Sequence, residues 1–203
     1  MKITKAEFIT SAAAKEQFIK SDKPVIAVSG KSNVGKSSFI NMLANRKKLA
    51  KVSKDPGRTR LINYFDFGDF ILADLPGYGY ARVSKEEKRR WGILLDAFFA
   101  DGANVDHVFA LADIRHQPTA DDKQMINFLY YKNVPFTLIA TKADKISRAA
   151  LNKNIASIAA ELRCGPANII ATSAHNRYGL EAVLERTENI INAVKSASGG
   201  EDA

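Results

Sequence analysis

The sequence is poor in the residues that cross-link a chain or anchor it in a membrane. It has one cysteine, Cys164, among 203 residues, so it cannot form a disulfide within the chain. No paired cysteine or histidine spacing suggests a zinc site, and no apolar run has the length of a signal peptide or a membrane span. Such a sequence suits a reducing compartment, so we expect a soluble cytoplasmic protein that is neither exported nor inserted into a membrane. Its length is that of one domain with its own core.

Positive charge is in excess and is concentrated in two segments. Lysine and arginine total 30 and aspartate and glutamate total 22, which gives a formal net charge of +8. Residues 46–60 hold seven basic residues and one acidic residue, a net of +6, and residues 82–90 hold five and two, a net of +3. The rest of the chain therefore sums to about −1. These segments are either solvated loop and helix faces or the contact surface of an anionic partner.

Hydrophobic runs and turn residues predict alternating strands and helices. We expect strands at residues 24–29, 61–67, 69–73, 105–111, 134–140 and 168–171, and helices at residues 36–45, 84–99 and 180–194. Ser84 with Glu87 and Thr119 with Asp122 are predicted capping boxes at helix starts. The pattern predicts an α/β fold of three layers, a mostly parallel six-stranded sheet with one antiparallel strand and helices on both faces. We expect an N-terminal extension at residues 1–22 that packs on the domain, the domain itself at residues 23–195, and a disordered tail at residues 196–203.

The strongest motif runs from Gly30 to Ser37 and matches the P-loop pattern between a strand and a helix. Gly30 and Gly35 permit a backbone path in which successive N–H groups face phosphate oxygens at a helix N-terminus. Lys36 supplies a cation for the β and γ phosphates, and the Ser37 hydroxyl is placed to ligate magnesium. The motif predicts a nucleoside triphosphate site.

Three later motifs select among the P-loop classes. Asp74-Leu75-Pro76-Gly77 follows a strand, so that Asp74 can hold magnesium through water and Gly77 can donate its N–H to the γ phosphate. Thr141-Lys142-Ala143-Asp144 and Thr172-Ser173-Ala174 each end a strand at the sheet edge where ligands bind. The Asp144 carboxylate can accept from guanine N1–H and the 2-amino group, the Ala174 N–H can donate to guanine O6, and the stem of Lys142 can lie along the purine. Adenine lacks those donors, so we predict GTP and GDP as ligands.

Taken together, these motifs resemble those of the EngB family, also called YihA or YsxC, among the translation-factor-related P-loop GTPases. The resemblance covers nearly the whole chain. It rests on residues 32–38, on residues 56–59 followed by 61–63, on residues 74–81, on residues 113–116 with 118–119, and on residues 141–144. It implies a single three-layer P-loop GTPase domain that hydrolyses GTP to GDP and phosphate with Mg²⁺. It also implies that Thr59 belongs to a first switch loop, which closes over the magnesium when the γ phosphate is present.

The resemblance further implies a role in assembly of the large ribosomal subunit in bacteria, with effects on cell growth, division and septation. The partner would be that subunit or its precursors, contacted at ribosomal RNA through the two basic segments. We expect a monomer. Two alternatives stay open: a GTPase switch whose main partner is a cell-division or envelope protein, and a P-loop enzyme on a small substrate, such as a nucleotide kinase. The second alternative would need a substrate-binding lid, which the sequence lacks.

Tyr78 stands where many GTPases have a glutamine that orients the attacking water. We therefore expect slow intrinsic hydrolysis that another group completes. The candidates are Arg58, Arg82, a group donated by the ribosome, or K⁺ held by Asn33, although Asn33 could equally serve only to stabilise its loop. The full set of expected nucleotide-binding residues is Gly30, Lys31, Ser32, Asn33, Val34, Gly35, Lys36, Ser37, Ser38, Pro56, Gly57, Arg58, Thr59, Asp74, Leu75, Pro76, Gly77, Thr141, Lys142, Ala143, Asp144, Thr172, Ser173 and Ala174. The expected Mg²⁺ ligands are Ser37, Thr59 and, through water, Asp74.

Overall fold

The predicted alternation of strands and helices is present. The structure is a computed structural model that describes residues 1–50, 61–79, 84–100 and 105–198, without the side chains of residues 85, 87, 88 and 198. Its strands are β1 (Glu7–Ala12), β2 (Val25–Gly30), β3 (Ile62–Asp66), β4 (Ile71–Asp74), β5 (His107–Asp113), β6 (Phe136–Thr141) and β7 (Ile169–Ala171). Its α-helices are α1 (Lys36–Leu43), α2 (Lys85–Phe98), α3 (Ala120–Tyr131), α4 (Arg148–Leu162) and α5 (Leu180–Ser198). Three short 3₁₀ helices are η1 (Lys15–Gln17), η2 (Ala143–Lys145) and η3 (Pro166–Asn168).

The strands form one sheet in the order β1-β3-β4-β2-β5-β6-β7. β3 pairs antiparallel with both of its neighbours, β1 and β4, and the remaining pairs are parallel. β3 is thus the single antiparallel strand that was predicted from the hairpin at Gly68, where φ is 85°. The sheet has one strand more than the six expected, because part of the N-terminal segment adds to its edge as β1.

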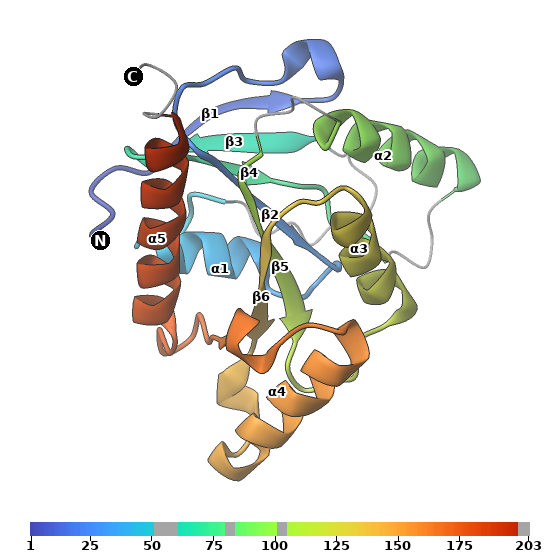
Figure 1. Cartoon of the computed structure of the whole chain (residues 1–203), viewed down its shortest axis with the longest axis vertical. Coiled ribbons are helices and arrows are strands. Elements are labelled where there is room, and N and C mark those ends of the chain that lie inside the picture. Colours follow the sequence, from blue (N-terminus) through green and yellow to red (C-terminus); the bar gives the residue numbers. More distant parts are fainter. Residues whose placement is uncertain (51–60, 80–83, 101–104, 199–203) are drawn as a thin grey trace.

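Helices cover both faces of the sheet, as expected for three layers (Figure 1). Alternate residues of each central strand point to opposite faces, so Val25 and Ala27 of β2 join one core cluster while Ile26 and Val28 join the other. The first cluster includes buried residues of α2, α3 and α4, and the second includes buried residues of α1 and α5. The sheet therefore has one hydrophobic core on each face. The loops at its edge remain available to form a binding site.

Helix boundaries agree with the sequence patterns except at the C-terminus. Thr119 and Asp122 form the predicted capping box of α3, in which Thr119 N donates to Asp122 Oδ2 at 2.8 Å. The predicted box at Ser84 involves the Glu87 side chain, which lies outside the described part of the chain. The last helix continues to Ser198, so residues 196–198, expected in a disordered tail, are helical. Residues 199–203 of that tail lie outside the described residues.

Residues near the N-terminus contact β3. Asp66 at the end of β3 accepts hydrogen bonds from Lys5 at 2.8 Å and from Lys23 at 3.0 Å. These bonds hold the pKa of Asp66 well below its usual range, and the bond from Lys5 has the largest effect. In the described residues, no helix combines the length and apolarity needed to cross a membrane.

Candidate nucleotide-binding site

The loop between β2 and α1 has the geometry that the P-loop motif requires. Gly35 at the start of α1 has a φ of 107°, a left-handed value that disfavours residues with a Cβ. A Cβ added at Gly30 would lie 2.8 Å from Val34 Cγ1 and 3.0 Å from Leu111 Cβ, so space also requires glycine there. The first turn of α1 holds no acidic residue. Its N–H groups and the positive end of the helix dipole therefore form a site suited to phosphate.

Lys36 and Asp74 bring a cation and a carboxylate to the same place. Asp74 is the last residue of β4, and its Oδ1 forms an ion pair with Lys36 Nζ. Ser37 follows Lys36 in the first turn of α1 and contributes a hydroxyl there. Such oxygen donors are the ligands that Mg²⁺ prefers in proteins. The described residues therefore fit this ion; the third expected ligand, Thr59, lies outside them.

The chain after β4 is bonded to the phosphate loop. Ser32 donates from its backbone N–H and from its hydroxyl to the carbonyl oxygen of Tyr78, at 2.9 and 3.0 Å. Tyr78 N donates in turn to Gly30 O at 3.4 Å. Gly77 lies so close to this loop that an added Cβ would be 3.3 Å from Ser32 Oγ. Residues 74–78 are thus fixed beside the loop that would hold the phosphates.

The side chain of Tyr78 is turned away from that loop and into the core. Its hydroxyl donates to Asp122 Oδ1 of α3 at 3.0 Å, and its ring lies 6.1 Å from the ring of Trp91, centroid to centroid. Burial raises the pKa of Tyr78 well above its usual value, and the nearby Asp122 carboxylate raises it further. A neutral, buried phenol bonded to another helix cannot orient a water at the phosphates.

Asp113, at the end of β5, holds two cations. Arg115 donates to its two oxygens at 2.9 and 2.7 Å, and Lys142 Nζ donates to its Oδ2 at 2.9 Å. Burial by itself raises the pKa of Asp113, but the hydrogen bonds from Arg115 and Lys142 outweigh it and hold that pKa well below the usual range. Lys142 Nζ also donates to Asn33 O at 2.8 Å. An ionised Asp113 therefore fixes Lys142 against the phosphate loop.

The loops after β6 and β7 are joined around Asp144. Ser173 Oγ donates to Asp144 Oδ1 at 2.7 Å, and Ala143 N donates to Thr172 O at 3.0 Å. The bond from Ser173 lowers the pKa of Asp144 against the opposing effect of burial. The result is an ionised carboxylate held beside Ser173 and Ala174. That arrangement can accept two parallel hydrogen bonds from a purine edge that carries donors.

The other predicted residues have more varied surroundings. Thr141 is buried, and its hydroxyl lies 2.7 Å from Val34 O and 3.1 Å from Ala112 O, so this side chain supports the phosphate loop. Leu75 is buried in the core, and Pro76 O accepts from the Trp91 indole at 3.3 Å. Lys31 pairs with Tyr78 through a parallel bridge, and Ser38 is exposed on α1. The predicted residues Pro56, Gly57, Arg58, Thr59 and Arg82 lie outside the described part of the chain.

Two residues in these contacts, Asp113 and Asp122, were not among the predicted site residues. Asp113 belongs to the stretch 113–116 that supported the family resemblance, which was the available signal for it. Asp122 was expected only as a helix cap, yet it also accepts from Tyr78. Each of the two accepts a hydrogen bond from a residue far away in the sequence, Asp113 from Lys142 and Asp122 from Tyr78.

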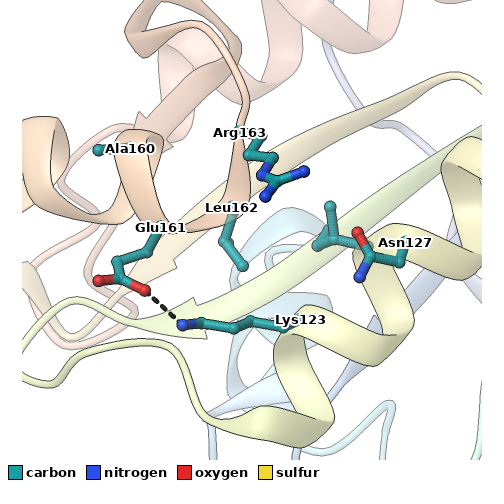
Figure 2. Close-up of a pocket in the computed structure, with 7 residues that line it drawn as sticks. Lys123, Asn127, Ala160, Glu161, Leu162 and Arg163 are labelled. Atoms are coloured by element: carbon teal, nitrogen blue, oxygen red, sulfur yellow. Dashed lines mark hydrogen bonds and ion pairs between the residues drawn. The ribbon is translucent and has the colours of Figure 1, made fainter.

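A cleft of about 430 Å³ lies elsewhere, between α3 and α4 (Figure 2). Lys123 and Glu161 form an ion pair across it, and Ile126, Asn127, Leu162 and Arg163 are among its lining residues. None of its lining residues belongs to the predicted nucleotide set. The cleft is therefore separate from the phosphate loop.

Comparison with known proteins agrees with this geometry. The family described as "50S ribosome-binding GTPase" matches residues 25–142. A protein of Caldanaerobacter subterraneus named "Probable GTP-binding protein EngB" is 44% identical over 192 residues, which are 94% of this chain and 99% of that protein. A Streptococcus pneumoniae protein of the same name is 43% identical over 92% of this chain and 98% of its own.

Solved structures show the same fold. A crystal structure of a probable GTP-binding protein EngB superposes with a TM-score of 0.69 at 24% identity, over 83% of this chain and 99% of its own. A crystal structure of Aquifex aeolicus Era bound to GDP.AlF4- superposes with a TM-score of 0.64 at 20% identity, over 82% of this chain and 56% of its own. The fold and the phosphate loop thus define a P-loop GTPase. With such identity over nearly its whole length, the chain belongs to the EngB family of GTP-binding proteins.

Proposed function

We propose that this GTPase is a nucleotide-dependent switch in assembly of the large ribosomal subunit, acting in the cytoplasm and so supporting cell growth, division and septation. The observation that carries the proposal is the match to the 50S ribosome-binding GTPase family over residues 25–142, a range that contains both basic segments. The described part of the first segment supports it, because Arg46, Lys47 and Lys48 are exposed. Such side chains suit contacts to RNA phosphates. The chain would act as a monomer.

The nucleotide would lie across the C-terminal edge of the sheet. Its phosphates would be bound by the backbone of residues 30–38 and by Lys36, with Gly77 N–H at the γ phosphate. Ser37, Thr59 and, through water, Asp74 would hold Mg²⁺, which neutralises phosphate charge when bound. A relative of the fold, Era, is described in complex with MgGDPNP and a segment of 16S ribosomal RNA. This supports a nucleotide-loaded, RNA-binding form of the present chain.

Asp144 would select guanine. Its oxygen that accepts from Ser173 retains further acceptor capacity, and its second oxygen faces only Lys145 at 3.2 Å among the described contacts. Adenine would leave this carboxylate without a donor, which costs binding free energy. The Lys142 stem, fixed by Asp113 and Asn33, would cover one face of the purine.

Hydrolysis by the isolated protein would be slow. Tyr78 is buried against Asp122, so position 78 offers no group to the attacking water. The missing function would come from Arg58, Arg82, the ribosome or K⁺. Asn33 is the proposed K⁺ ligand. It is exposed in the phosphate loop, and its side chain forms no hydrogen bond with another described residue. The Asn33 carbonyl already accepts from Lys142, which fixes its backbone.

Sedimentation with purified ribosomal particles tests the proposed function. Protein loaded with a non-hydrolysable GTP analogue should pellet with large subunits or their precursors, more than the GDP form does. Binding should weaken steeply with salt because phosphate contacts release counterions. Lys47→Ala should flatten the salt dependence without changing GTP affinity. If both nucleotide forms stay in the supernatant at low salt, the ribosomal role fails, and binding to an acidic division or envelope protein would favour the alternative partner.

A further inference from the structure

The first basic segment begins as a rigid loop. Asn41, buried in α1, accepts from Ala50 N at 2.8 Å and donates to Ala50 O at 3.0 Å, so its amide closes the turn after the helix. Ala50 is buried in the core. Arg46, Lys47 and Lys48, between these fixed points, are all exposed. The loop therefore presents three cations without the loss of entropy that a flexible segment would suffer on binding.

A fourth cation reaches the same loop from the far end of the sequence. Arg177 Nη1 donates to Asn45 Oδ1 at 2.6 Å, although the two residues are 132 positions apart. Among the described residues, no ion pair is formed by Arg46, Lys47, Lys48 or Arg177. Four cations from two segments thus lie on one surface with no carboxylate bound to them there.

The segment that carries Arg177 is itself fixed and ends in an exposed aromatic ring. Ser173 N donates to Tyr178 O at 3.0 Å, and Tyr178 N donates to Asn176 Oδ1 at 3.2 Å. Gly179 has a φ of 75°, and an added Cβ would lie 2.1 Å from Ala171 O, so the turn admits only glycine. The Tyr178 side chain is 48% exposed. Tyr178 directly follows Arg177, and an exposed tyrosine is a side chain on which unpaired bases of single-stranded RNA stack.

We propose that Arg177 and Tyr178 join Arg46, Lys47 and Lys48 in one RNA-binding surface, in which the cations contact phosphates and Tyr178 stacks on an unpaired base. This rests on the proposed function and adds a segment, residues 177–178, that the two basic segments do not contain. Through Ser173 the surface adjoins Asp144, but neither Arg177 nor Tyr178 bonds to Asp144 itself.

The test compares two anionic probes that differ in bases. Polyuridylate offers phosphates and unpaired bases, whereas inorganic polyphosphate offers phosphates alone. Binding of each to the full chain is measured across a salt series for the wild type, Arg177→Asn, Tyr178→Ala and Tyr178→Phe. Asparagine is chosen at position 177 because φ is 62° there and asparagine tolerates that conformation. Arg148→Ala, at an exposed arginine of α4, is the matched control, and GDP affinity checks that each variant is folded.

Arg177→Asn should weaken both probes and lower the salt slope for polyuridylate by about 0.7, the value of one phosphate contact on a single strand. Tyr178→Ala should weaken polyuridylate about tenfold and leave polyphosphate unchanged, while Tyr178→Phe binds like the wild type. Arg148→Ala should change neither. If Arg177→Asn binds both probes as Arg148→Ala does, Arg177 is not part of an RNA-binding surface. The proposed function would still be tested separately, by pelleting of Lys47→Ala with ribosomal particles. If Tyr178→Ala leaves polyuridylate binding unchanged, the surface is a general anion site suited to an acidic protein, and the RNA assignment is overturned.

Discussion

Tyr78 and Asp122 connect the segment after β4 to helix α3 through a buried hydrogen bond of 3.0 Å. The same Asp122 carboxylate accepts from the backbone N–H of Thr119 and so caps α3. Because Tyr78 O also accepts twice from Ser32, one residue joins the phosphate loop to a helix on the face of the sheet. The tyrosine at this position therefore has a structural place, and its hydroxyl is bonded to α3.

Tyr78→Phe separates this structural role from a role in the reaction. Removing the hydroxyl should lower the free energy of unfolding by about 1 kcal/mol, because Asp122 loses one buried donor while the ring packing is kept. The single-turnover rate at saturating GTP should stay within about twofold of wild type, since the hydroxyl does not reach the phosphates. Denaturant unfolding and rapid-quench hydrolysis measure the two quantities. A tenfold loss of rate with unchanged stability would show that Tyr78 acts in the reaction.

Asp113→Asn tests whether Asp113 positions Lys142. The substitution removes the charge that holds Lys142 and Arg115, so nucleotide affinity should fall by about tenfold, the size of one weakened charge-assisted hydrogen bond. The hydrolysis rate at saturating GTP should be retained. Asp96→Asn is the matched control. Among the described residues, the only ion pair of Asp96, in α2, is with Lys132 at the end of α3, at 3.4 Å. Equal GDP affinities for the two variants would remove the positioning role.

Potassium dependence tests the assignment of Asn33. Wild-type hydrolysis should be faster in potassium than in sodium salts at the same ionic strength, and Asn33→Gly should lose the difference. Glycine is the suitable replacement because φ at position 33 is 64° and the carbonyl must still accept from Lys142. GDP affinity in sodium should be unchanged, as a check on the loop. Equal rates of wild type in the two salts would remove K⁺ from the account.

His107 predicts how stability depends on pH. Burial, followed by the charge of Arg186, lowers its pKa from 6.5 to about 4, and its Nε2 lies 2.9 Å from Thr137 Oγ1. Between those pH values the unfolded chain binds a proton that the folded chain does not. Stability from this group is therefore fully present above pH 6.5 and is lost as the pH falls to about 4, by about 3 kcal/mol in all.

Denaturant unfolding of His107→Gln across this window measures that loss. The glutamine can still bond to Thr137 but does not titrate, so the free energy of unfolding should fall less steeply below pH 6.5 than in wild type. His116→Gln is the control, since His116 is exposed in the loop after β5. If the free energy of unfolding of His107→Gln falls below pH 6.5 as steeply as that of the wild type, His107 is not the source of the pH dependence.

Much of the sheet could be predicted because its central strands are buried apolar runs. All six predicted strands occur within two residues of their predicted limits. β1 could not be predicted: Glu7, Phe8 and Ile9 are exposed at the sheet edge, and a bulge between Phe8 and Thr10 breaks any alternation. The burial that gives strands their sequence pattern is missing there.

The site was predictable where its parts are contiguous in sequence and not where they are brought together by the fold. The P-loop and the loop of Asp144 follow from local motifs. The bond from Tyr78 to Asp122 spans 44 residues and that from Lys142 to Asp113 spans 29, and no local pattern indicates which side chains meet across such separations.

Selection of guanine by Asp144 can be tested with the single substitution Asp144→Asn. Guanine offers two donors to a carboxylate, whereas an amide carries its own donors and suits the additional oxygen of xanthine. Equilibrium titrations with GTP and xanthosine triphosphate are compared for wild type, Asp144→Asn and the control Asp69→Asn in the exposed β3–β4 turn. Only Asp144→Asn should lose GTP affinity and gain affinity for xanthosine triphosphate. Unchanged GTP affinity in Asp144→Asn, with no gain for xanthosine triphosphate, would contradict it.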